Sequence, residues 1–352
     1  ANARMGRMAG KTLGLYLLTT AIAITLALLF ANLINPGLGI DMSSAASYTP
    51  KPAPSLKDVL INIFPTNPVK AMAEGNMLQV IVFAILMGVA VSHSGEKGKE
   101  ALRFFESFNE VVMTMVSLLM HLAPYGVFCL LAKLFSELGL SAILDLAKYF
   151  FTVAFVLLLH GLVIYTGMFK LLTRLSPWVL LKNVRPAMLF AFSTSSSSAT
   201  MPVTMNVAEK RLGIDNSIAS FTVPLGATIN MDGTAIMQGV ATVFIAQAFN
   251  IDISLGGYVA VVLTATLASI GTAGVPGVGL ITLALVLQQV GLPVEGIALI
   301  IGVDRLLDMM RTAVNVTGDC MVSSVVARSE GLLDETIFYE VSDRDEYEEL
   351  GS

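Results

Sequence analysis

The chain has 352 residues, of which 55% are apolar and only 13% are charged, and its formal net charge is −5. Soluble domains carry about 25% charged residues, so a chain this poor in charge must expose much of its surface to lipid. Its two cysteines form neither a metal-ligand spacing nor a disulfide framework, and nothing in the composition indicates nucleic-acid binding. The composition predicts a multi-pass membrane protein, which we expect in the inner (plasma) membrane.

Apolar segments alternate with polar ones through the first half of the chain. Four spans are expected near residues 13–34, 78–91, 108–134 and 149–172, each close to the ~20 apolar residues that cross a bilayer. Residues 39–57 are predicted to form an exposed loop, and residues 96–103 a charged turn. Lysines and arginines cluster before the first span, after the second and after the fourth, which predicts that these segments are cytoplasmic.

In the second half, polar or small residues interrupt the apolar segments. Serines and threonines fill residues 193–200, Asn-Met-Asp-Gly-Thr breaks a helix-length run at 230–234, and a segment rich in glycine occupies 269–277. A hairpin-like segment followed by a polar-interrupted span thus occurs twice, the pattern typical of a secondary transporter's midplane site. Two alternatives remain open: a polar helix–helix contact for the serines, and a plain re-entrant turn for the glycines.

The last apolar helix carries a polar stripe. At 100° per residue, Asp308, Arg311, Thr312, Asn315 and Asp319 fall within a roughly 100° arc that must face the bundle interior. Burying the four ionised groups, Asp232, Asp308, Arg311 and Asp319, in a membrane costs on the order of 10 kcal/mol unless they are paired or ligated. A structural salt bridge could explain Asp308 with Arg311 but not the other two acids. Asp304, one turn earlier, is expected near the interface and left out of the site.

At these motifs the chain resembles the dicarboxylate/amino acid:cation symporter family, which includes archaeal aspartate transporters and mammalian excitatory amino acid transporters. The likeness extends from about residue 4 to 330 and rests on the serine-rich run, Asn-Met-Asp-Gly-Thr at 230–234, Gly-Thr-Ala-Gly-Val-Pro-Gly at 271–277, and the polar pattern of residues 308–319. It implies an all-α polytopic fold with an elevator mechanism, assembled as a homotrimer in the lipid bilayer, and two further helices ahead of the first span.

The resemblance also implies a division of the chain. Residues 58–136 would form scaffold helices for trimerisation, and residues 8–35 and 141–330 a transport domain. Re-entrant hairpins are expected near 183–212 and 254–293, an extracytoplasmic loop at 36–57, and a solvated, acidic cytoplasmic tail at 331–352.

By the same resemblance, the substrate is an acidic amino acid and the coupling ion is Na⁺. Arg311 would bind the side-chain carboxylate, and Asp308 the amino group. The α-carboxylate would be held by Asn315 with Ser196, Ser197 and Ser198, and Thr234, Thr312, Val275 and Gly279 would line the same pocket. One sodium site would use Asp319, Gly226, Asn230 and Asn315; a second Thr228, Ser269, Ile270 and Thr272; a third Asp232, Asn230, Tyr16, Thr19 and Thr20.

The chain departs from the family at Ser195 and Met309, where relatives place an arginine at one position or the other. Three acids and one arginine leave the site at −2, which three sodium ions and a substrate of −1 would neutralise. Alternative functions are proton coupling, a C4-dicarboxylate substrate and an anion-conducting channel. An intramembrane aspartyl protease would not need Arg311, and a serine hydrolase lacks both a histidine near the serine run and a Gly-x-Ser-x-Gly elbow.

Overall fold

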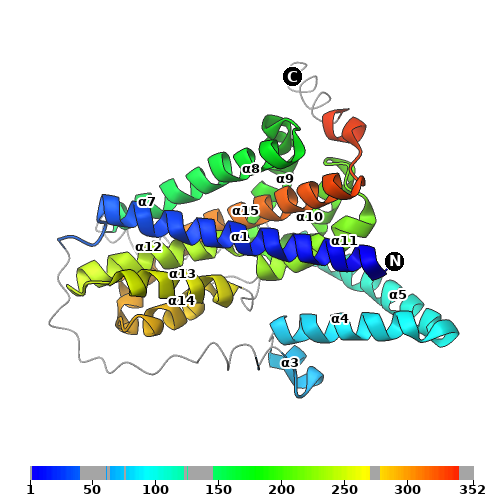
Figure 1. The fold of residues 1–352 in the computed structure, drawn as a ribbon, viewed down its shortest axis with the longest axis horizontal. Coiled ribbons are helices and arrows are strands. Elements are labelled where there is room, and N and C mark those ends of the chain that lie inside the picture. Colours follow the sequence, from blue (N-terminus) through cyan, green and yellow to red (C-terminus); the bar gives the residue numbers. More distant parts are fainter. Residues whose placement is uncertain are drawn as a thin grey trace.

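The computed structural model describes residues 2–39, 61, 64–74, 77–122, 125, 146–269 and 278–340, and most of these residues are helical (Figure 1). Among them, two helical stretches are long and apolar enough to cross a membrane, Ala3–Ile34 and Ala147–Thr173. The second is the continuous run of α7 (Ala147–Leu159), a π-helical turn η2 (His160–Ile164) and α8 (Tyr165–Thr173). The predicted all-α membrane architecture is confirmed in this coarse form.

The first half contains α1 (Asn2–Ile34), α3 (Pro68–Glu74), α4 (Met77–His93) and α5 (Gly95–Met120). The prediction of a charged turn at 96–103 was wrong, because α5 runs through these residues and the turn falls at Ser94 and Gly95. Gly95 has a φ of +59°, which glycine adopts without strain. Lys99 and Glu96 are both exposed on this helix and pair with each other at 2.7 Å.

Both predicted breaks that fall on described residues are confirmed. The helix α9 (Pro177–Thr194) is separated from α10 (Ser197–Lys210) by Ser195 and Ser196. The helix α11 (Asn216–Ile229) is separated from α12 (Asp232–Ala248) by Asn230 and Met231. After α13 (Leu255–Ser269) and α14 (Val278–Gln289) come the short 3₁₀ turn η3 (Val294–Gly296) and α15 (Ile297–Glu330). The glycine-rich tip and most of the predicted 36–57 loop lie outside the described residues.

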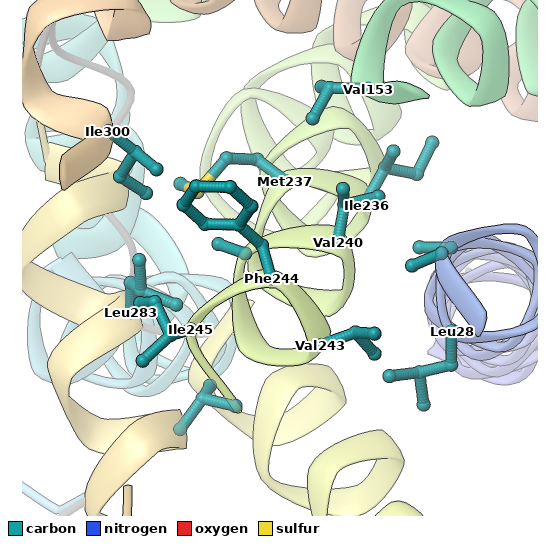
Figure 2. Packing of buried hydrophobic residues seen from close by; sticks show 14 of the residues in the cluster. Leu28, Val153, Ile236, Met237, Val240, Val243, Phe244, Ile245, Leu283 and Ile300 are labelled. Carbon is teal, nitrogen blue, oxygen red and sulfur yellow. The ribbon is translucent and has the colours of Figure 1, made fainter. Parts of the chain in front are cut away.

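The helix α12 forms the centre of one hydrophobic core because it is apolar on nearly every side. Figure 2 shows its side chains radiating toward different neighbours: Val243 toward Leu28 of α1, and Ile245 toward Leu283 of α14. A second core joins α8, α9, α10 and α11. The long helix α15 packs against both groups, so its polar stripe lies deep in the bundle.

The start of the predicted solvated tail is docked on the protein. Phe338 is fully buried and stacks on Phe169 at 5.9 Å, and Asn183 donates a hydrogen bond to the Phe338 carbonyl. The backbone of Asp334 also donates to the Gly213 carbonyl at 2.7 Å. The expectation of a wholly solvated tail was therefore wrong at Phe338, whereas Asp334, Glu335 and Glu340 are exposed. Residues 341–352 lie outside the described part.

Candidate functional site

The polar stripe of α15 is buried as predicted. Exposed fractions are between 1% and 8% for each of its polar members, Asp304, Asp308, Arg311, Thr312, Asn315 and Asp319. Asp304, which the predicted site left out, belongs to this buried set. Because buried ionised groups are stable only when paired or ligated, the partners of each one define what the site can bind.

Arg311 is held between two carboxylates of its own helix. Its Nη1 lies 2.6 Å from Oδ1 of Asp304, seven residues earlier, and its Nη2 lies 3.2 Å from Oδ1 of Asp308. Arg305 approaches the other oxygen of Asp308, with Nη1 3.9 Å from Oδ2. The Nε of Arg311 is buried and has no hydrogen-bond partner among the described residues, which leaves a donor free for a ligand.

Two glycines let neighbouring helices approach Arg311 closely. A Cβ on Gly233 would lie 2.5 Å from the Arg311 carbonyl oxygen, so the start of α12 contacts the backbone of α15 directly. A Cβ on Gly279 would lie 3.1 Å from Thr234 Cγ2 and 3.3 Å from Arg311 Nη2. The structure thus brings together Arg311, Thr234 and Gly279, three of the residues predicted to contact substrate.

The break between α11 and α12 is joined to α15 by amide side chains. Asn230 Nδ2 donates to Oδ1 of Asp319 at 2.9 Å and to the carbonyl of Asn315 at 3.1 Å. Asn315 Oδ1 accepts a 2.7 Å hydrogen bond from the backbone N–H of Gly233. A Cβ on Gly226 would clash with Asp319 Oδ1, so this backbone passes against the carboxylate. The four residues predicted for the first ion site therefore lie together.

Asp232 is fully buried at the start of α12 and is contacted from two other helices. Thr20 of α1 donates to its Oδ1 at 2.7 Å, which agrees with the grouping predicted for the third ion site. Tyr165 donates to Oδ2 at 2.5 Å, and Nε2 of His160 lies 3.0 Å from the same oxygen. The π-helical turn His160–Ile164 allows these two side chains, five residues apart, to reach one carboxylate.

Other predicted residues fall into three groups. Ser196 caps the start of α10 by accepting from the Ala199 N–H at 3.1 Å, which places the serines at the tip of the α9–α10 pair. Thr228 and Ser269 are buried near the ends of α11 and α13. Ile270, Thr272 and Val275 lie outside the described residues.

Sequence reasoning missed four contacting residues: Asp304, Arg305, His160 and Tyr165. The sequence signal for Asp304 was present, because it shares the stripe of α15. Arg305 precedes Asp308 by three residues, which is about one helical turn. A buried histidine in an apolar span is likewise a reason to look for a partner. The π-helical register that pairs His160 with Tyr165 has no comparable pattern in the sequence.

Ionisable groups that face the interior of a helical bundle, beside helices broken midway, are typical of a membrane transporter. A family model described as the sodium:dicarboxylate symporter family matches residues 1–329, and the chain belongs to this family. Its members are transporters rather than enzymes. The chain is accordingly a secondary symporter and a multi-pass protein of the plasma membrane.

Named relatives come from bacteria and animals. The chain is 35% identical over 341 residues to the proton/sodium-glutamate symport protein of Bacillus caldotenax, an alignment covering 94% of this chain and 80% of the relative. It is 36% identical over 343 residues to the proton/glutamate-aspartate symporter of Escherichia coli strain K12, covering 94% and 78%. It is 40% identical over 262 residues to the human excitatory amino acid transporter 1, covering 74% and 48%.

Proposed function

We propose that this symporter carries an acidic amino acid together with sodium ions. The observation that carries the proposal is Arg311, an arginine only 1% exposed whose Nε has no partner among the described residues. A planar guanidinium pairs with carboxylates through two parallel hydrogen bonds, so Arg311 suits the side-chain carboxylate of aspartate or glutamate. The names of relatives, which include glutamate and aspartate symporters, support the same substrate class.

The remaining substrate contacts follow from the chemistry around Arg311. Asp308 offers a carboxylate one helical turn away, suited to the substrate's ammonium group. Asn315 and the serine tip at 196–198 supply amide and hydroxyl donors for the α-carboxylate. Thr234 and Gly279, which lie against Arg311, line the pocket with Thr312 and Val275. A substrate lacking the amino group would leave Asp308 without this partner, which disfavours a C4-dicarboxylate.

Sodium is a co-substrate that fits the oxygen groups around Asp319 and Asp232. The first site would use the Asp319 carboxylate with carbonyls of Gly226, Asn230 and Asn315. Asn230 Oδ1 is buried without a hydrogen-bond partner among the described residues, so it leaves an acceptor for a cation in the third site. Asp232 would bind there with oxygens of Tyr16, Thr19 and Thr20. Thr228, Ser269, Ile270 and Thr272 would form the second site. All ligands are oxygens, which suits a hard monovalent cation.

Charge balance agrees with three sodium ions. Asp232, Asp308, Asp319 and Arg311 sum to −2, and the newly found Asp304 and Arg305 cancel each other. Three sodium ions and one substrate of net charge −1 bring the site to zero. A neutral loaded site crosses the low-dielectric membrane at the lowest electrostatic cost.

The movement proposed for transport is an elevator, with α9–α10 and α13–α14 as re-entrant hairpins. In Figure 1, α3, α4 and α5 lie along one side of the helical body. Among the described residues, α5 contacts α10 and α4 contacts α11, so both helices border the proposed transport domain. Residues 58–136 would form this scaffold in a homotrimer. Light scattering of the detergent-purified protein should therefore give three times the chain mass.

The central test is uptake of radiolabelled L-aspartate into proteoliposomes with and without an inward sodium gradient. Uptake should require sodium. Arg311→Cys should abolish aspartate uptake and admit a neutral amino acid, because the pocket then lacks the cation that pairs with the side-chain carboxylate. Sodium-dependent aspartate uptake by Arg311→Cys equal to that of the unchanged protein would contradict the substrate assignment.

Proton coupling is the second candidate, because three bacterial relatives are named for protons as well as sodium and one for protons alone. Uptake measurements in the same proteoliposomes distinguish proton coupling from sodium coupling. Uptake driven equally well by an inward proton gradient in sodium-free buffer would favour protons, and would reassign Asp232 and Asp319 as proton carriers. No uptake without sodium, at any proton gradient, would favour sodium.

A further inference from the structure

Asp308 lies between two arginines of its own helix, one three residues before it and one three residues after it. Oδ1 is 3.2 Å from Nη2 of Arg311, and Oδ2 is 3.9 Å from Nη1 of Arg305. At 100° per residue, positions i−3 and i+3 lie about 60° to either side of position i. Each oxygen of the carboxylate therefore faces a different guanidinium.

The two arginines differ in how firmly they are held. Arg311 is fixed by the 2.6 Å contact with Asp304, and its side chain is 1% exposed. The Arg305 side chain is 18% exposed, its contact with Asp308 is long, and its Nε is buried without a hydrogen-bond partner among the described residues. Arg305 is thus the more easily displaced of the two.

We propose that Arg305 is a movable counter-charge for Asp308, which it neutralises in the empty site and releases when a substrate ammonium group arrives. The inference rests on the proposed function, since it takes Asp308 as the group that binds the amino group. Two cations then compete for Oδ2, one from the protein and one from the substrate. Arg305 acts through Asp308 and is a positioning residue.

This competition has opposite effects on two steps of transport. When substrate is bound, Arg305 is a competitor, so its removal should strengthen binding. When the site is empty, Arg305 cancels one buried negative charge, so its removal should slow the return of the empty site across the membrane. Net uptake requires that return step, whereas exchange of internal for external substrate does not. A purely structural role would weaken both processes together.

The experiment compares net uptake and exchange of radiolabelled L-aspartate in proteoliposomes at saturating sodium. Arg305→Met and Arg305→Gln remove the charge with different polarity, and Arg305→Lys retains it. The control is Arg328→Met, which removes an arginine from the same helix at a partly exposed position outside the site. Thermal unfolding of each purified variant establishes that it is folded. If only one of the two neutral variants folds, that variant alone is sufficient for the test.

In the neutral variants, net uptake should fall by about tenfold or more, whereas exchange should fall less and show a lower KM for aspartate. Arg305→Lys should restore net uptake, and Arg328→Met should match the unchanged protein. Parallel losses of net uptake and exchange, or no change in either, would overturn the role of Arg305. Absence of aspartate uptake by the unchanged protein would instead remove the proposed function, and this inference with it.

Discussion

Tyr165, the first residue of α8, donates a 2.5 Å hydrogen bond to Asp232, the first residue of α12. His160 reaches the same oxygen, and Thr20 reaches the other. All of these side chains are almost completely buried. Because Asp232 is fully buried, these partners both stabilise the carboxylate and fix its orientation toward the proposed ion site.

Tyr165→Phe should therefore weaken sodium binding. Loss of a partner that orients a ligand costs about 10–100-fold in metal affinity in well-studied sites. The measurement is the sodium concentration for half-maximal aspartate uptake, which should rise by about tenfold with the maximal rate less affected. Tyr149→Phe is the matched control, since the Tyr149 hydroxyl is buried without a hydrogen-bond partner among the described residues. Equal sodium dependence in the two variants would contradict the role of Tyr165.

Asp304→Asn should weaken binding of the acidic substrate. The amide cannot match the charge-assisted contact that holds Arg311 Nη1 at 2.6 Å, so the guanidinium loses its fixed orientation. Hydrogen bonds to charged groups contribute about 1.5–3 kcal/mol, so the KM for aspartate should rise by about 10–100-fold. Asp252→Asn, at an exposed position, is the control. An unchanged KM in Asp304→Asn would show that Asp308 alone positions Arg311.

The helix breaks and the polar stripe could be predicted from the sequence, whereas some contacts within the site could not. The breaks at 195–196 and 230–231 were predictable because small and polar residues, mainly serine, asparagine and glycine, interrupt long apolar segments there. The stripe of α15 followed from helical periodicity alone. The partner of Arg311 was harder: Asp304 and Arg311 are seven residues apart, and only the packed bundle shows that both ends of this stripe are buried.

Other contacts depend on registers that the sequence does not display. His160 and Tyr165 share one partner because a π turn adds a residue to the helical repeat, whereas a 3.6-residue period places positions five apart 140° from each other. The docking of Phe338 was also hidden, since the acids around it dominate the local composition. In both places a tertiary contact overrides the local pattern.

Gly279→Ala should impair substrate binding more than folding. The added Cβ would lie 3.1–3.3 Å from Thr234, Met237 and Arg311, so these neighbours must move by a few tenths of an ångström. The expected result is a higher KM for aspartate with little change in the unfolding temperature. Gly167→Ala is the control, because a Cβ there meets no atom within 4 Å, and it should stabilise α8 by about 0.5–1 kcal/mol. Identical KM values in the two variants would argue against a pocket at Gly279.

Phe338→Ala should destabilise the protein. Truncating a buried phenylalanine removes apolar contact and leaves a cavity, at a cost of about 3–5 kcal/mol. The unfolding temperature should drop well below that of the unchanged protein, whereas Phe104→Ala, at a position 61% exposed, should change it little. A Phe338→Ala protein as stable as the control would show that residues 332–340 do not need this contact to stay docked.

Glu330, the last residue of α15, ties that helix to the start of α1. Its carboxylate lies 2.7 Å from Arg7 Nη2 and 2.6 Å from Lys11 Nζ, and Arg4 approaches at 4.0 Å. Hydrogen bonds from Arg7 and then Lys11 lower the pKa of the Glu330 carboxyl to about 2. A depressed pKa means that the folded protein favours the ionised form, so this contact stabilises the fold wherever the carboxylate is charged.

Glu330→Gln should therefore lower the unfolding temperature by the same amount at pH 7 and pH 6. Both values lie above the ordinary pKa of 4.5, where the contribution is complete. Between pH 4.5 and about 2 the contribution is lost, so the difference between variant and unchanged protein should shrink over that range. High salt should also reduce it, because the cations are partly exposed and screened. Glu96→Gln is the exposed control. A difference independent of both pH and salt would mean that Glu330 acts through packing rather than charge.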